Sequence, residues 1–339
     1  MVERLPPIMF HHFHSETQPK YAAGSITADE LECIIRAVGR DNVLDADVYA
    51  QRRIDGTLLP QQTCFTFDDG LQCQYQVALP VLQRHNIRAA WHIFTCVYEE
   101  RVPEQLEVYK YFQAQYYTTI DDFYRDFFVK AEAAYGKRIR IALESHAART
   151  HASLASFYSV SDRQFRYVRD VILRADEFFD IITRMMKERS LKPSSLLDSL
   201  WMSAEQLREL VRQGHVVGLH SHTHNRNMDT ANIDIQTIEY TTNYVQLCQI
   251  IRTDPMLHSY SPLCMAHPLG KYRSDVTARV LEGLGIKLGF LAHDDGTTET
   301  CAPAYAVPRM DHGVLLNMIN KSSFRASDGK KWAESTQKD

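Results

Sequence analysis

Short apolar runs alternate with amphipathic helical patterns along most of the chain, and this alternation restricts the folds that the chain can adopt. The first predicted helix shows the local signals, because Thr27 and Glu30 form a capping box and Gly39 ends the pattern. Strands separated by helices favour an α/β fold with a mostly parallel sheet or barrel. The predicted strands are PIMFHHF (7–13), TCFTF (63–67), RAAWHIF (88–94), HVVGLH (215–220), LCMAH (263–267), KLGFLAH (287–293) and YAVPRM (305–310).

The middle of the chain, residues 98–200, lacks this alternation and favours helices, so we expect a helical insertion there. Apolar residues at helical spacing predict one helix over 161–189. We interpret the arginines of this segment as a solvated face, with a subunit interface in a homo-oligomer or a surface for an anionic group as alternatives. Residues 1–97 and 201–319 then form one discontinuous barrel domain, and 320–339 a flexible polar tail.

The composition excludes several classes of protein. The 339 residues carry a formal net charge of −4 and contain no basic cluster with interleaved aromatic residues, so we expect no nucleic-acid partner. No apolar run approaches the roughly 20 residues of a spanning helix, and residues 1–16 hold an acid and two prolines, so we expect neither a membrane span nor a signal peptide. Seven scattered cysteines without a CxxC pair favour reduced thiols and a cytoplasmic protein.

Two pairs of polar residues follow predicted strands. Asp68 and Asp69 are neighbours, and like charges this close raise each other's cost of ionisation unless a cation lies between them. His220 and His224 are four positions apart, so one helical turn or a tight loop can aim both imidazoles at one point. A solvated turn and two surface histidines are the alternatives for each pair taken alone.

Because the carboxyl ends of parallel strands lie at one mouth of a barrel, the two pairs would meet there. One aspartate with two imidazoles makes a three-ligand site with an open position, which is typical of catalytic zinc and related metals. The charge of the ion would allow the second aspartate to stay ionised beside it as a base. The combination therefore predicts a catalytic metal site.

Four stretches resemble, in the same order, the polysaccharide deacetylases, the NodB-homology domain of carbohydrate esterase family four. They are TFDDG (66–70), AAWHIF (89–94), WMSAEQLRELVRQGHVVGLHSHTHN (201–225) and MAHPLG (265–270), and the resemblance covers about 200 of the 339 residues. It implies a distorted, partly open (β/α)7 barrel. It also implies that Asp68 is the catalytic base and that Asp69, His220 and His224 hold one divalent ion. Zinc is favoured, with nickel, cobalt, manganese or iron as alternatives.

The chain departs from the family pattern in three places. Asp69 and His220 are 151 positions apart (220 − 69), which leaves room for the helical insertion. Ala266 stands where the third family motif has an arginine that pairs with the base, and we expect Arg309 to supply this cation. The family's C-terminal motif with the general acid is missing, and PIMFHHF resembles its counterpart in a permuted branch, which makes His11 the candidate acid. His12 or His14 takes this role if the register differs.

The resemblance implies hydrolysis of an N-acyl group, with N-acetyl on an amino sugar favoured. Asp68 would act as base, His11 would protonate the leaving amine, and a backbone N–H near Leu269 would stabilise the oxyanion. His222 and His267 are candidates for substrate contact. We expect a nucleotide sugar or glycan precursor in surface-polysaccharide or O-antigen biosynthesis. A deformylase or other linear-amide hydrolase on this scaffold and an inactive carbohydrate-binding protein are the alternatives.

Overall fold

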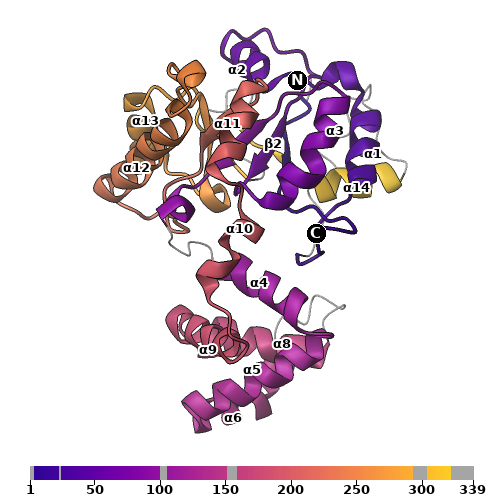
Figure 1. Ribbon diagram of the computed structural model, residues 1–339, viewed down its shortest axis with the longest axis vertical. Helices are drawn as coiled ribbons and strands as arrows, with labels where there is room; N and C mark the ends of the chain where they lie inside the picture. The colour runs from indigo at the N-terminus through magenta and orange to yellow at the C-terminus, as the bar shows by residue number, and fades with distance from the viewer. Residues whose placement is uncertain (1–3, 23, 100–104, 151–158, 293–303, 322–339) are drawn as a thin grey trace. The chain divides into compact units, whose positions relative to one another are not determined.

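A computed structural model describes residues 4–22, 24–99, 105–150, 159–292 and 304–321. The chain divides into two compact units, one made of Met1–Pro103 with Asp198–Asp339 and the other of Glu104–Leu197. Each unit is described by itself, and Figure 1 shows the helices and strands of both. Among the described residues, no helix combines the length and apolar character needed to cross a bilayer.

The larger unit is built on one sheet of seven parallel strands, in the order β6-β5-β4-β3-β2-β1-β7. The sheet curls into a half-barrel, which confirms the predicted distorted, partly open (β/α)7 barrel. Its strands are β1 (Ile8–Phe10), β2 (Phe65–Asp68), β3 (Ala90–Ile93), β4 (Val216–Leu219), β5 (Cys264–Ala266), β6 (Leu288–Phe290) and β7 (Met310–Asp311).

Aromatic residues fill the core around the central strands. Phe10, Phe67 and Trp91 come from three adjacent strands, and Phe67 stacks on both of the other rings at 5.1 and 4.4 Å between centroids. All three side chains are fully buried. Continuous apolar strands of this kind are expected in a parallel sheet that is covered on both faces.

The segment before β7 spans the gap between the two ends of the sheet. Val307 bridges Phe290 at the end of β6, and Leu291 donates its backbone N–H to Val307 at 2.8 Å. Three residues later, Met310 pairs with Ile8 of β1. Residue 309 therefore lies between the two ends of the sheet. The strand predicted over 305–310 is only Met310–Asp311, so Met310 alone falls within the predicted range.

Helices connect the strands and surround the sheet (Figure 1). The first helix, α1, has the predicted capping box at Thr27 and Glu30, and Gly39, with φ of 85°, ends this helix. The helix predicted over 75–86 begins as a π-helix, Gln74–Ala78, and continues as α3 with Pro80 in its first turn. The helices of this unit are α1 (Ala28–Val38), α2 (Ala46–Ile54), α3 (Leu79–Arg84), α11 (Ala204–Arg212), α12 (Ile233–Arg252), α13 (Ser274–Gly283) and α14 (His312–Asn320).

The smaller unit is helical and packs around an aromatic cluster that includes Phe123, Phe127 and Phe165. The single helix predicted over 161–189 is wrong. The chain is extended at Leu173, with φ of −90° and ψ of 146°, and a new helix starts after Arg174. Its helices are α4 (Gln105–Tyr116), α5 (Ile120–Tyr135), α6 (Lys137–Glu144), α7 (His146–Thr150), α8 (Val160–Tyr167) and α9 (Ala175–Glu188), and the short α10 (Leu197–Leu200) follows.

Two arginines of the predicted solvated face pair with nearby aspartates. Arg169 contacts Asp170 and Arg174 contacts Asp176, and the Arg174 pair is largely exposed. The Arg174 pair fits a solvated face, whereas Arg169 is only 19% exposed and the Nε atoms of Arg163 and Arg166 are buried, so the solvated face is not confirmed for the segment as a whole. A homo-oligomer through this unit stays a prediction. Of the predicted flexible tail, residues 322–339 lie outside the described residues.

Candidate active site

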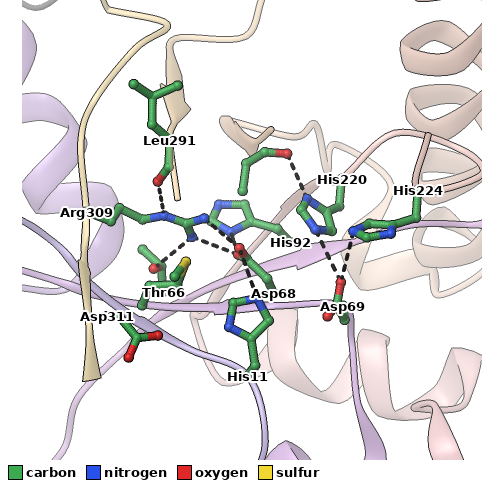
Figure 2. Close-up of polar contacts among 12 residues, drawn as sticks. His11, Thr66, Asp68, Asp69, His92, His220, His224, Leu291, Arg309 and Asp311 are labelled. Atoms are coloured by element: carbon green, nitrogen blue, oxygen red, sulfur yellow. Dashed lines mark hydrogen bonds and ion pairs between the residues drawn. The ribbon is translucent and has the colours of Figure 1, made fainter. Parts of the chain in front are cut away.

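The two polar motifs meet at the carboxyl ends of β2 and β4, as Figure 2 shows. Asp68 is the last residue of β2, and Asp69 follows it with φ of 75°. Gly70 has φ of 63°, and a Cβ atom there would lie 2.9 Å from Ile93. The sharp turn, which only glycine fits at this point, sends the side chains of the two aspartates to different partners.

Asp69, His220 and His224 form a buried cluster whose candidate ligand atoms lie within 4.8 Å of one another. Oδ1 of Asp69 is 3.3 Å from Nε2 of His220 and 3.5 Å from Nε2 of His224. This oxygen is buried and accepts no hydrogen bond from the described residues. Burial alone would raise the pKa of Asp69, but imidazoles that carry a proton towards it hold the pKa below its ordinary range, and a cation in the place of those protons would do the same.

The cluster fits a divalent cation. Nδ1 of His220 donates a hydrogen bond to the carbonyl oxygen of Ala266 at 2.8 Å. In the neutral ring the lone pair of Nε2 therefore faces Asp69. Two imidazole nitrogens and a carboxylate oxygen are the donor set of catalytic zinc and of related transition metals. A cation among them would also give the buried Oδ1 atom the partner that it lacks among the described residues.

The loop that carries both histidines is held by α12. The carboxylate of Glu239 accepts hydrogen bonds from the backbone N–H of His222 at 3.0 Å and from the backbone and hydroxyl of Thr223 at 2.9 and 2.6 Å. Asn243 accepts from the backbone of His220 at 2.9 Å. Ser221 and His224 have positive φ, so the loop is neither helical nor relaxed, and these contacts hold it in place.

Asp68 binds different partners from Asp69, and the strongest is Arg309. The guanidinium donates to Oδ1 at 2.8 Å and to Oδ2 at 2.5 Å, and both side chains are buried. Nδ1 of His92 lies 2.8 Å from Oδ1 of Asp68. Burial would raise the pKa of Asp68, but the charge of Arg309 and the hydrogen bonds from His92 and Arg309 hold the pKa well below its usual range.

Arg309 is itself fixed in place. Its Nε donates to the carbonyl of Leu291 at 2.6 Å, and one terminal nitrogen donates to the hydroxyl of Thr66 at 3.1 Å. The segment before β7 thus places a cation against Asp68, the predicted base. Ala266 ends β5 and offers only its carbonyl oxygen, which His220 uses.

The strand predicted over 7–13 is shorter in the structure, where β1 ends at Phe10. His11, the candidate acid, directly follows the carboxyl end of this strand. Its Nε2 lies 3.9 Å from Oδ2 of Asp68, and its side chain is 30% exposed. Partial burial lowers the pKa of His11 below its ordinary value, while the nearby carboxylates of Asp69 and Asp68 act to raise it. Gln74 donates to the carbonyls of His11 and Asp68 at 2.8 and 2.6 Å and so ties the ends of β1 and β2 together.

The neighbouring histidines have other contacts. Nδ1 of His14 lies 3.0 Å from the hydroxyl of Ser25. The ring of His12 stacks on His11 and meets Tyr21 edge-on. Of these rings, the described contacts place only His11 within reach of an Asp68 carboxylate oxygen.

The structure separates the three candidates for substrate contact. His267 is 1% exposed, and its ring nitrogens lie 2.7 Å from the Tyr305 carbonyl and 3.4 Å from the Tyr240 hydroxyl, so its partners are structural. Nδ1 of His222 lies 3.0 Å from the Thr95 hydroxyl. Leu269 is 44% exposed with φ of 55°.

Three contributors to the site were not singled out in the sequence. His92, Glu239 and Asn243 are buried polar residues of a strand and a helix, and they act on partners distant in the sequence. One signal was available in α12, where Gln236, Glu239, Tyr240 and Asn243 form a buried polar row at helical spacing.

No protein-family model matches the chain, and no curated protein matches it. Solved structures do. The chain is similar to the deacetylase PplD of Streptococcus pyogenes, determined in complex with acetate, at 14% identity over 92% of this chain and 93% of that chain, with a TM-score of 0.51. IcaB from Ammonifex degensii shares 15% identity over 91% of each chain, with a TM-score of 0.45. BC0361, a polysaccharide deacetylase from Bacillus cereus, shares 10% over 95% of this chain and 69% of that chain, with a TM-score of 0.47.

The likeness to PplD defines the class of fold to which the chain belongs. The chain has the NodB-type deacetylase fold, as its motifs predicted. The permuted branch of the family, which depends on the N-terminal histidine, stays a prediction.

Proposed function

We propose that the protein is a metal-dependent amide hydrolase that removes an N-acyl group, with N-acetyl favoured, from an amino sugar. The observation that carries this proposal is the buried cluster of Asp69, His220 and His224 beside the separately held carboxylate of Asp68. One carboxylate has an oxygen that accepts no hydrogen bond from the described residues, while the other is kept ionised by an arginine. A cluster that served only the fold would not be expected to combine a buried carboxylate oxygen without a hydrogen bond in the described part of the chain, as in Asp69, with a second carboxylate that is held ionised, as in Asp68.

Asp69, His220 and His224 would hold the ion through Oδ1 and the two Nε2 atoms. Zinc is the favoured ion, and nickel, cobalt, manganese or iron would accept the same donors. When bound, the ion supplies Lewis acidity, which lowers the pKa of a water molecule and polarises the substrate carbonyl.

The protein's own groups would handle the protons. Asp68, ionised through Arg309, accepts a proton from the attacking water. His11, 3.9 Å from Oδ2 of Asp68, gives a proton to the nitrogen of the leaving amine as the C–N bond breaks. The backbone N–H of Leu269 would donate to the oxyanion. Acetate and a free amine are the products.

The proposal is tested by metal analysis of the purified protein and a screen of N-acylated sugars. The panel holds N-acetylated nucleotide sugars, N-acetylated oligosaccharides and the matching N-formyl compounds, and released acetate or formate is measured. We expect metal-dependent acetate release that the Asp68→Asn variant lacks. Formate release alone would indicate a deformylase, and a protein that neither takes up an ion nor turns over any compound would refute the proposal. We further propose that the substrate is a nucleotide sugar or glycan precursor of surface polysaccharide or O-antigen, and faster turnover of the nucleotide sugars than of the oligosaccharides would support this.

A further inference from the structure

We infer that His92 is a positioning residue that leaves one free lone pair on the catalytic base Asp68. This inference rests on the proposed function. His92 is the third residue of β3, lies opposite Asp68 in the sheet register and is 0% exposed. It belongs to none of the proposed ligand, base or acid positions, so the proposed chemistry does not explain why a polar ring is buried there.

The donors around Asp68 divide its two oxygens. Oδ1 receives Nδ1 of His92 at 2.8 Å and one nitrogen of Arg309 at 2.8 Å. Oδ2 receives the other Arg309 nitrogen at 2.5 Å. A carboxylate oxygen accepts about two hydrogen bonds, so Oδ1 is saturated while Oδ2 keeps one acceptor position. Oδ2 is also the oxygen that faces His11, at 3.9 Å (Figure 2).

The proton on His92 can be assigned from its two partners. The ionised carboxylate of Asp68 only accepts hydrogen bonds, so Nδ1 carries a proton. Nε2 lies 3.5 Å from Sγ of Cys264, and burial lowers the pKa of His92 to about 4, so Nε2 carries no proton and can accept a hydrogen bond from the thiol. His92 is therefore neutral, with its single proton on Nδ1. A second buried cation beside Arg309 would repel it at close range.

Two donors that are carried by different segments of the chain hold the carboxylate more firmly than one. The Arg309 fork alone permits the carboxylate plane to tilt about the axis between the two groups, whereas a donor from β3 prevents that tilt. The ring of His92 is held in turn by Phe290, 5.4 Å away between centroids. Small misplacement of a reacting group is costly, and losses of about 100-fold are typical.

Substitutions of His92 by amide side chains can distinguish the effect of the hydrogen-bond donor from the effect of the ring. In His92→Asn the amide nitrogen replaces Nδ1, in His92→Gln it replaces Nε2, and in His92→Phe the ring stays without a donor. With 4-methylumbelliferyl acetate as probe, we expect kcat to fall about 10- to 100-fold in the Gln and Phe variants with KM and metal content unchanged. The Asn variant should stay within a few-fold of the parent protein. His215→Phe, which replaces another buried histidine outside the site, is the matched control and should keep its kcat.

A second measurement needs no turnover. Nitrogen NMR of protein labelled with ¹⁵N-histidine reports the tautomer of each ring, and the His92 signal is the one missing from His92→Asn. We expect a neutral Nδ1–H tautomer. A proton on Nε2, a charged ring, or full kcat in the Gln and Phe variants would overturn the inference. If the parent protein cleaves neither the probe nor any sugar, the proposed function fails instead, and the NMR result still decides the tautomer.

Discussion

Arg309 and Asp68 are 241 residues apart in the chain, yet the guanidinium of Arg309 donates two hydrogen bonds to the Asp68 carboxylate in the buried centre of the site. The segment between β6 and β7 makes this possible, because it pairs first with the end of β6 and then with β1. Ala266 offers no cation at the position where we expected one, and Arg309 thus reaches the proposed base Asp68 from another part of the fold.

Arg309→Met leaves the Asp68 carboxylate buried without its cation, so we expect a loss of about 3–5 kcal/mol in the free energy of unfolding together with a loss of kcat. Arg309→Lys keeps the charge but cannot donate two parallel hydrogen bonds to the carboxylate. Its unfolding free energy and its kcat should therefore lie between those of the parent protein and Arg309→Met. The control is Arg84→Met, which breaks an exposed pair with Glu32 and should cost no more than about 1 kcal/mol. Urea titration measures the unfolding free energy of each variant. Equal losses in Arg309→Met and Arg84→Met would contradict the pairing of Arg309 with Asp68.

Each proposed metal ligand is one of only three from the protein. Asp69→Ala, His220→Ala and His224→Ala should therefore lower the bound metal, whereas Asp68→Asn should keep the metal and lose turnover. Metal content and thermal unfolding with added zinc are the measurements. At 100 times the Kd, a bound ion stabilises the fold by about 2.7 kcal/mol, and the ligand variants should lose this gain. Metal loss in the Asp68 variant alone would reverse the roles of the two aspartates.

Glu239 holds the loop between the two histidine ligands without contacting the proposed ion position itself. Glu239→Ala should weaken zinc binding about 10- to 100-fold, because the backbone of His222 and Thr223 loses its anchor. Glu239→Gln keeps an oxygen for the two N–H groups and should bind zinc nearly as well as the parent protein. Calorimetry of the metal-free proteins measures this, and equal affinities in all three would show that the loop needs no anchor.

His215 gives the fold a sensitivity to acid that is independent of the metal. Burial lowers its pKa to about 4, and its Nδ1 accepts the backbone N–H of Ala89 at 3.0 Å. The unfolded chain, with an ordinary pKa of about 6.5, binds more protons between these values, so stability is fully present above pH ~6.5 and falls as the pH drops towards 4. His215→Phe should flatten this part of the curve of unfolding free energy against pH. An unchanged slope would show that His215 does not titrate in this window.

Much of the sheet could be predicted because its strands are short apolar runs bounded by capped helices. The strand expected over 63–67 is Phe65–Asp68, and the Thr27–Glu30 capping box is present. The prediction was least accurate for β7, at the edge of the sheet. There Val307 forms only an isolated bridge, and the strand has two residues. In the smaller unit, Leu173 breaks a periodic pattern that continues through it, and no glycine or proline marks the break.

The site was predictable where a motif names its residues, as in Asp68, Asp69, His220 and His224, which the structure brings together. His92 gave no such signal, because a histidine in an apolar strand has the same appearance whether it packs in the core or contacts a carboxylate. Only the register that places His92 beside Asp68 separates the two cases. Glu239 depends likewise on a loop 16 or 17 positions earlier in the chain.

The proposed acid His11 can be separated from the base by the choice of leaving group. An amine must receive a proton as the C–N bond breaks, whereas an aryl oxide such as that of 4-methylumbelliferyl acetate departs without one. A variant that lacks only the acid should therefore lose amide hydrolysis and keep ester hydrolysis. A variant that lacks the base should lose both.

His11→Ala should accordingly lower the hydrolysis of an N-acetyl sugar about 10²- to 10⁴-fold while ester hydrolysis stays within a few-fold of the parent protein. Asp68→Asn should lower both rates, and all variants should keep their metal. His14→Ala is the control, because its ring contacts Ser25, and neither rate should change. Selective loss in His12→Ala would move the acid by one position, since the two rings stack. Equal loss of both activities in His11→Ala would show that this ring supports Asp68 and that the proton comes from elsewhere.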